Sequence, residues 1–207
     1  RRIDEGTQDL SDLALFGSTE LLIVPSLLLK PAIRFAYNSR YKAPIIPSLN
    51  LKYNIDNLVF RASYARGFRA PSLKELYFDF VDINHNIVGN TDLNAEFSHN
   101  ITSDVSFKKT FSSVQLKMDL GFFYNNMDNL ITLAISPNDP QQYTYVNIGE
   151  YSTIGNTFNA GIGYKQININ LGVANVGRLN TLSATYTDVP RYNYSPEIRI
   201  NSTYRNK

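Results

Sequence analysis

Apolar and polar residues alternate along most of this sequence, and no other feature restricts its fold as strongly. The pattern is clearest between Val114 and Tyr124, where every second residue is apolar and most residues between them are polar or glycine. Because successive side chains of a β-strand point to opposite faces, this stretch predicts a strand with one apolar and one polar face. The same alternation recurs at Ile33–Tyr37, Leu49–Tyr53, Leu58–Tyr64, Phe97–Phe107, Phe158–Tyr164, Ile167–Val173 and Ile198–Tyr204.

The connections between these stretches are alternately short and long. Short turns are expected at 54–56, 110–113 and 165–166. Long loops are expected at Arg69–Glu96, Ile135–Gln142 and Thr187–Pro196. This order predicts an all-β fold, an antiparallel up-and-down meander of about nine strands with about ten residues each.

Two architectures satisfy this pattern. A soluble sandwich or barrel turns its apolar faces inward, whereas a membrane barrel turns them outward to lipid. The polar faces carry charged residues such as Arg61, Lys117 and Asp119, and several apolar faces end in tyrosine, as at Tyr64 and Tyr124. Aromatic residues at strand ends are typical of a membrane–water interface, so they favour the membrane barrel without excluding the sandwich.

Composition excludes several classes of function. The chain has 20 Lys and Arg against 18 Asp and Glu, for a net charge of +2, which is not the balance of a nucleic-acid-binding protein. It has no cysteine and only two histidines, His85 and His99, so no metal centre and no cofactor are expected. Asp82–Asn86 resembles the start of a calcium loop, but Ile87 stands where that loop needs glycine. No Ser-His-Asp arrangement or distinctive carboxylate pair is recognisable, so no enzyme activity is expected.

The segment "YARGFRAPSLKELYFDF", from Tyr64 to Phe80, stands where a predicted strand gives way to the longest loop. Pro71 ends the strand because it has no N–H to donate to a β-ladder. Ser72 and Glu75 have the spacing of a capping box, which predicts one helical turn after Pro71. A long polar and aromatic stretch then leads to the next strand.

This segment and the one that follows it resemble a known family. "ASYARGFRAPSLKELYF" followed by "VGNTDLNAEFSHN" is similar to the barrel of TonB-dependent outer-membrane receptors, especially those of Bacteroides-like bacteria. Thr91 is a departure, because the family usually has proline there. Phe122–Thr132 and Tyr145–Ile162 resemble the next two strands of the family. The resemblance implies a structural motif at the outer rim of the barrel, made of Gly67, Phe68, Pro71, Glu75, Gly89 and Asn90.

The resemblance also implies where the chain belongs. Family members lie in the bacterial outer membrane and enclose a plug domain in a barrel of roughly 22 strands. Residues 1–207 are therefore expected to be a partial barrel domain, without the plug and without the remaining strands. The expected partners are the TonB complex, the plug, an extracellular small molecule and membrane lipid, with no nucleic acid. Isolated in water, such a fragment is expected to self-associate through its apolar face.

The function implied by the resemblance is uptake of a scarce nutrient, such as a ferric siderophore or cobalamin. The first alternative is a structural or adhesive β-barrel or sandwich that transports nothing, and the second is a carbohydrate-active enzyme on a β scaffold, which would need an acid/base pair in a cleft. Arginine and aromatic side chains together suit anionic aromatic ligands, although the same residues could simply fasten the rim. The candidate ligand-binding residues at the rim and in its loop are Arg66, Arg69, Tyr77, Phe78, Asp79, Asp82 and His85.

Overall fold

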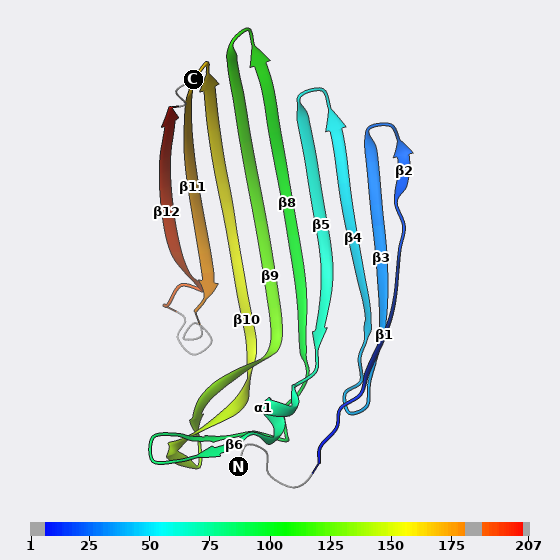
Figure 1. The fold of residues 1–207 in the computed structure, drawn as a ribbon, viewed down its shortest axis with the longest axis vertical. Coiled ribbons are helices and arrows are strands. Elements are labelled where there is room, and N and C mark those ends of the chain that lie inside the picture. Colours follow the sequence, from blue (N-terminus) through cyan, green and yellow to red (C-terminus); the bar gives the residue numbers. More distant parts are fainter. Residues whose placement is uncertain (1–6, 181–187, 205–207) are drawn as a thin grey trace.

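One large antiparallel sheet forms most of the molecule (Figure 1). The computed structural model describes residues 7–180 and 188–204. Nine strands follow one another across the sheet in the order β1-β3-β4-β5-β8-β9-β10-β11-β12, which confirms the predicted meander. Their bounds are β1 Asp12–Ser18, β3 Leu27–Asn38, β4 Ile45–Ile55, β5 Leu58–Arg69, β8 Glu96–Phe111, β9 Val114–Ser136, β10 Asp139–Tyr164, β11 Ile167–Leu179 and β12 Tyr192–Tyr204.

A short strand, β2 (Leu21–Val24), lies off this path and pairs with β3 beside β1. β1 and β2 together form one interrupted edge strand. The interruption faces Pro31 of β3, whose carbonyl accepts a bond of 3.2 Å from the N–H of Thr19. Pro31 cannot return a hydrogen bond, because proline has no N–H. Proline at this position is compatible with a strand close to the sheet edge.

Tight turns join the strands at one end of the sheet. Asp56, Ser112 and Lys165 in three of these turns have φ of 48°, 52° and 52°, the left-handed conformation that hairpin turns require. The predicted short connections at 54–56, 110–113 and 165–166 are thus confirmed. The long connections lie at the opposite end, where β5 leads to β8 and β11 leads to β12 (Figure 1).

Two sequence predictions about length are wrong. Ile135–Gln142 was expected to be a loop, but only a tight turn at Pro137 and Asn138 separates β9 from β10. We call the main sheet of nine strands the wall. β9 and β10 contain 23 and 26 residues, more than twice the predicted ten, because their ends at the β9–β10 turn continue beyond the wall. Of the expected loop Thr187–Pro196, residue 187 lies outside the described residues and the stretch from Tyr192 belongs to β12.

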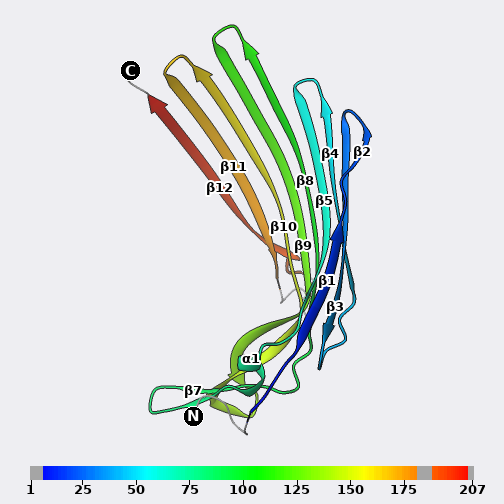
Figure 2. The same ribbon diagram turned by 45° about the vertical axis from the view of Figure 1, so that its right-hand side comes forward.

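Beyond the wall, the β5–β8 connection and the β9–β10 hairpin fold together into one unit, which we call the cap (residues 70–95 and 129–148). The connection contains α1 (Leu73–Tyr77), β6 (Asp79–Val81) and β7 (Asn86–Val88). β7 pairs in parallel with β10, where Ile87 faces Tyr143 and Val88 faces Thr144. Figure 2 shows the cap bending to one side of the line of the long strands.

The best-defined hydrophobic core of the described residues lies in the cap rather than in the wall. Leu76, Leu93 and Ile131 are at most 8% exposed and pack together. In contrast, the wall leaves one apolar face open, with Leu120, Ile198 and Ile200 exposed by 55%, 70% and 72%. An open apolar face of this kind needs a nonaqueous neighbour. Its predicted self-association in water stays a prediction.

The opposite face of the wall is polar. Arg61 lies 2.9 Å from Asp104 across the β5–β8 pair, and Ser63 lies 2.6 Å from Thr102 on the same face. Among the described residues, no helix is long and apolar enough to cross a membrane.

Candidate functional site

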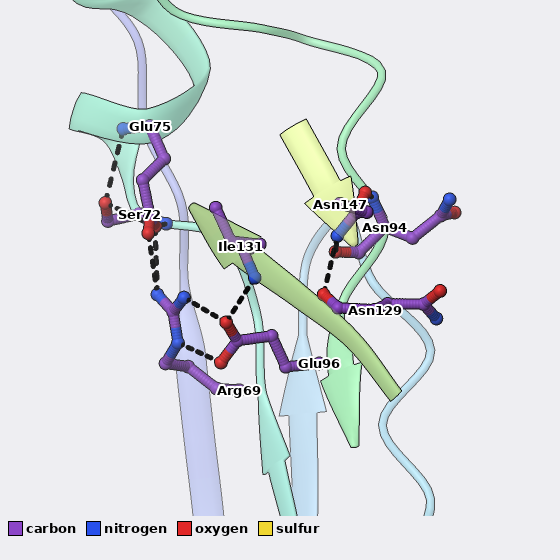
Figure 3. Close-up of polar contacts among 8 residues, drawn as sticks. All are labelled: Arg69, Ser72, Glu75, Asn94, Glu96, Asn129, Ile131 and Asn147. Carbon is purple, nitrogen blue, oxygen red and sulfur yellow. Dashed lines mark hydrogen bonds and ion pairs between the residues drawn. The ribbon is translucent and has the colours of Figure 1, made fainter. Parts of the chain in front are cut away.

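Arg69, the last residue of β5, joins two carboxylates where the wall meets the cap (Figure 3). Its Nη2 donates to Glu96 Oε1 at 2.7 Å, and its Nη1 donates to both carboxylate oxygens of Glu75 at 2.9 and 3.0 Å. Hydrogen bonding to Glu96 raises the pKa of Arg69 above its ordinary value. The guanidinium of Arg69 is thus occupied by protein partners and fastens α1 to the first residue of β8.

Glu75 has a second role in the predicted capping box at the start of α1. Ser72 Oγ accepts a bond from the Glu75 N–H, and the Ser72 N–H donates to Glu75 Oε2 at 2.7 Å. Burial alone raises the pKa of Glu75, but hydrogen bonds from Arg69 and Ser72 outweigh it and hold the pKa below its usual value. The carboxylate is therefore anionic wherever the cap is folded at neutral pH.

Glu96 extends this cluster to the far side of the cap. Its Oε1 accepts a 2.7 Å bond from the backbone N–H of Ile131, a buried residue of β9. β8 pairs with β9 only as far as Phe97 and Asp128, so the ladder itself offers this N–H no partner on β8. The carboxylate of Glu96 therefore accepts the hydrogen bond from Ile131 that a backbone carbonyl of β8 would accept if the pairing continued.

Amide side chains connect the two parts of the cap nearby (Figure 3). Asn147 Nδ2 donates to the carbonyls of Asn94 and Asn129 at 3.0 and 2.7 Å, and Asn147 Oδ1 accepts from the Asn94 N–H at 2.8 Å. Asn129 has a φ of 58°, a left-handed conformation that asparagine tolerates better than most residues. These bonds hold the β5–β8 connection against the β9–β10 hairpin.

The second half of the predicted rim motif, Gly89 and Asn90, also packs against α1. The N–H of Gly89 donates to Phe78 O at 2.6 Å, and that of Asn90 donates to Glu75 O at 2.9 Å. A Cβ on Gly89 would lie 2.6 Å from the carbonyl carbon of Leu76 and 2.7 Å from the nitrogen of Phe78. Only glycine allows this approach of two backbones.

Gly67, Phe68 and Pro71, the rest of the rim motif, mark the end of β5. Phe68 packs on Phe97 with ring centroids 5.6 Å apart, and Pro71 is fully buried. A Cβ on Gly67 would overlap the hydroxyl of Ser98. The six motif residues therefore make contacts within the chain, and their structural role at the outer rim stays a prediction.

A hollow of about 360 Å³ lies between α1 and the β6–β7 hairpin. Three candidate residues, Tyr77, Phe78 and Asp79, line it together with Val88 and Gly89. The hydroxyl of Tyr77 also accepts a hydrogen bond from Arg40, a residue of the β3–β4 connection. No sequence motif pointed to Arg40, because its contact with Tyr77 joins residues 37 positions apart.

His85 lies at the tip of the β6–β7 hairpin, where Asp82 orients it. Asp82 Oδ1 accepts bonds from the N–H groups of Asn84 and His85 at 2.7 and 2.8 Å, and the His85 Nδ1 lies 3.0 Å from the same oxygen. The backbone bond from Asn84, followed by the contacts with His85, lowers the pKa of Asp82. The ring of His85 lies 5.0 Å from that of Phe80, and its side chain is 52% exposed.

An imidazole held in this way has one nitrogen left for a ligand. The carboxylate of Asp82 accepts the proton on Nδ1, which leaves Nε2 with a free lone pair. Histidines that bind metal ions commonly have a carboxylate on the other ring nitrogen, because it fixes both tautomer and orientation. Within the described ranges, no group of three or more His, Asp or Glu is placed to hold a metal ion by protein ligands alone.

The structure brings five of the seven candidate residues together, but not Arg66 or Arg69, whose guanidinium is bound by Glu75 and Glu96. Tyr77, Phe78 and Asp79 line the hollow, while Asp82 and His85 follow directly on the hairpin. Arg66 lies on β5 opposite His99, on the same face as Tyr64 and Phe68, which is the apolar face of the wall.

A sequence model of one family, described as "TonB dependent receptor-like, beta-barrel", matches residues 3–207. The chain belongs to this family. Its members are outer-membrane proteins, and the apolar face of this receptor barrel is the face that meets lipid. In such barrels the short turns face the periplasm and the long loops face outward, so the cap lies at the extracellular end.

Curated relatives come from Haemophilus influenzae. The "Hemoglobin and hemoglobin-haptoglobin-binding protein C" is 39% identical over 90 residues, which cover 42% of this chain and 8% of that protein. The "Heme/hemopexin utilization protein C" is 27% identical over 179 residues, which cover 76% of this chain and 24% of that protein. The chain thus spans a quarter or less of the length of these relatives.

Solved structures share the fold. The siderophore receptor PirA of Pseudomonas aeruginosa superposes with a TM-score of 0.64 at 18% identity, over 96% of this chain and 43% of PirA. A double mutant of the hemophore receptor HasR of Serratia marcescens, in complex with its hemophore HasA and heme, gives a TM-score of 0.66 at 14% identity. That match covers 80% of this chain and 33% of HasR.

Proposed function

We propose that this receptor barrel belongs to a transporter that takes up haem across the outer membrane, and that the cap forms part of the haem-binding mouth. The observation that carries the proposal is the orientation of His85. Its Nδ1 lies against the Asp82 carboxylate, so Nε2 is directed to act as an axial ligand of the haem iron.

The surroundings of His85 also suit a porphyrin. The rings of Phe80 and His85 are 5.0 Å apart, and those of Phe78 and Phe80 are 5.9 Å apart. Aromatic faces can stack on a flat conjugated macrocycle. Val81 and Ile83 at the same tip are 61% and 101% exposed, which adds apolar surface at the extracellular end.

The names of the curated relatives support haem over other ligands. Two kinds of Haemophilus influenzae protein matched by this chain are named for hemoglobin and for heme. The solved structures include receptors for both a siderophore and a heme-carrying hemophore. Fold alone therefore does not choose between these ligands, and the choice rests on His85.

A ferric siderophore is the second candidate, and cobalamin is a third. Many siderophores are anionic and need cationic side chains with hydrogen bonds to spare. In the described part of the cap and its surroundings, Arg69 is bound by two carboxylates, and Arg40 is bound by Tyr77 and the Thr91 carbonyl. The ammonium group of Lys74 lies over the ring of Phe78 at 5.0 Å, and the lining of the hollow contains no lysine or arginine among the described residues. Because these cationic side chains already have partners within the protein, the cap is better suited to haem, an aromatic ligand that carries its own metal, than to an anionic siderophore.

Transport further requires the plug domain and the TonB complex, which we include in the proposal as partners. The plug closes the lumen, and the polar face of the wall, with Arg61 and Asp104, is the surface it meets. Energy from TonB is then needed to move the ligand past the plug.

Growth on one limiting nutrient at a time tests the proposal. The full-length receptor is expressed in cells that lack their own haem receptor, with haem, a catecholate siderophore or cobalamin supplied as the limiting nutrient. We expect growth on haem, and we expect deletion of TonB to abolish it. Growth on the siderophore or cobalamin but not on haem would contradict haem as the transported ligand. Growth on haem without TonB would contradict TonB-dependent transport.

A further inference from the structure

The small sheet in the cap has one open edge. β10, β7 and β6 lie side by side in this sheet, and within the described ranges β6 pairs with β7 alone. The β6–β7 hairpin projects from the cap beside α1 (Figures 1 and 2). An open strand edge is a template for the pairing of another chain.

The hydrogen bonds of the hairpin determine which backbone groups of β6 face the open edge. The carbonyl of Phe78 accepts a 2.6 Å bond from the N–H of Gly89, at the end of the β6–β7 ladder. In an antiparallel pair, alternate residues bond to the partner strand. The N–H and C=O groups of Phe80 therefore face β7 as well. Those of Asp79 and Val81 point to the open edge.

The hollow of about 360 Å³ beside this strand contains one charged group. Asp79 lines it together with Tyr77 and Phe78, and the lining includes no lysine or arginine among the described residues. Asp79 is half-buried and forms no ion pair with any described residue, Lys74 included. A carboxylate beside aromatic rings suits the side chain of an arginine or lysine, which can form an ion pair and a cation–π contact.

The charge of the hairpin favours a basic partner over a second copy of this chain. Residues 79–84 contain two aspartates and no lysine or arginine. A second copy of β6 would therefore bring like charges into the new ladder, which is unfavourable. Val81 and Ile83 are 61% and 101% exposed, so they also offer apolar surface that a partner can cover.

We propose that β6 binds an extended, positively charged segment of an extracellular protein, which adds a strand to the open edge. The backbone groups of Asp79 and Val81 bond to this segment, and one of its arginine or lysine side chains enters the hollow beside the Asp79 carboxylate. In strand addition the main chain supplies affinity, and pockets for alternate side chains supply specificity. The inference goes beyond the proposed function, because it requires neither haem nor His85.

A fluorescent peptide tests the proposal on the full-length receptor in neutral detergent. The peptide alternates threonine and valine around a central arginine, and both of its termini are blocked. We expect the wild type to bind it at concentrations up to about 1 mM, with slower hydrogen exchange of the Asp79 and Val81 N–H groups. V81P is expected to bind about tenfold or more weakly, because it removes an outward N–H and its ring blocks the approach of a strand. V81A keeps the N–H and is the matched control.

A second variant tests the hollow. D79N is expected to bind the arginine peptide about tenfold more weakly, because the charge opposite the guanidinium is lost. It should bind a peptide with glutamine in place of arginine as the wild type does. H85A should bind the arginine peptide like the wild type, so a failure of the haem proposal leaves this test intact.

Four outcomes would overturn the inference. Two are absence of wild-type binding at about 1 mM and equal binding by V81P and V81A. The third is full protection of the Asp79 and Val81 N–H groups without peptide, which would mean that another segment of the receptor covers β6. The fourth is a receptor dimer that V81P dissociates, which would identify a second copy as the partner. Exchange of the Gly89 N–H verifies that the hairpin of V81P is folded, and D79N decides the matter if it is not.

Discussion

The carboxylate of Glu96 accepts a hydrogen bond of 2.7 Å from the backbone N–H of Ile131, across 35 residues of sequence. Glu96 is also bound by Arg69, which in turn binds Glu75 of the capping box. One glutamate thereby connects the barrel wall, α1 and the β9–β10 hairpin. The cap is consequently an ordered extension of the wall, which can hold a ligand-binding residue in a fixed place.

Replacing Glu96 by alanine is expected to loosen the cap. E96A leaves the buried N–H of Ile131 unsatisfied, which costs about 1–3 kcal/mol in local stability. Hydrogen exchange of the full-length receptor should show faster exchange of Ile131 and of residues 72–95. The E96Q variant is the control, because its amide oxygen can still accept from Ile131 while the charge opposite Arg69 is lost. If E96A exchanges like the wild type at Ile131, the bridging role of Glu96 is refuted.

Gly89 is expected to tolerate no side chain. The Cβ of G89A would lie within 2.7 Å of backbone atoms of Leu76 and Phe78, so α1 and β7 must move apart. Protease cleavage within the cap is expected to increase in the full-length receptor. G149A provides a matched control, since a Cβ at Gly149 meets nothing within 4 Å. Equal protease resistance of the two variants would show that the close approach of α1 and β7 is not required.

Acid is expected to weaken the attachment of α1. The folded-state pKa of Glu75 is held below its ordinary value of 4.5, so the folded cap binds protons less readily than the unfolded one. The contribution of Glu75 is therefore complete above about pH 4.5 and is lost as the pH falls through the lowered folded-state pKa. Hydrogen exchange of residues 70–78 measured from pH 6 to pH 3 should show this loss in the wild type. A wild-type acid profile that matches that of E75Q would contradict it.

The amide bridge at Asn147 is expected to secure the middle of the cap. N147A removes three hydrogen bonds to the backbone of Asn94 and Asn129. Each contributes about 1 kcal/mol, so exchange of the Asn94 N–H should rise roughly tenfold or more. N168A, at the far end of the wall, serves as the control and should leave this N–H unchanged. A protected Asn94 N–H in N147A would mean that other contacts hold the loop.

The sequence predicts the wall much better than the cap. Alternation between Val114 and Tyr124 follows directly from burial against lipid on one face, and each such stretch became a strand. The capping box of Ser72 and Glu75 is a local signal as well, and it is confirmed. Both predictions needed only residues close together in the chain.

The features that could not be predicted from the sequence depend on contacts between residues that lie far apart in the chain. Pro137 and Pro140 suggest a loop, yet β9 and β10 continue into the cap because β10 finds a partner in β7. Arg66 has the same residue type as Arg69 and lies only three positions away, but alternation puts the two on opposite faces of β5. The bridge from Glu96 to Ile131 could not be predicted, since it depends on where β8 stops pairing with β9.

The absorption spectrum of haem bound to the full-length receptor tests the central claim most directly. If His85 Nε2 is an axial ligand, the wild type should give the spectrum of a histidine-ligated haem. H85A should lose that spectrum and bind haem at least about tenfold more weakly. H99A removes the other histidine, which lies on the outer wall, and should match the wild type. An unchanged spectrum and affinity in H85A would contradict the account.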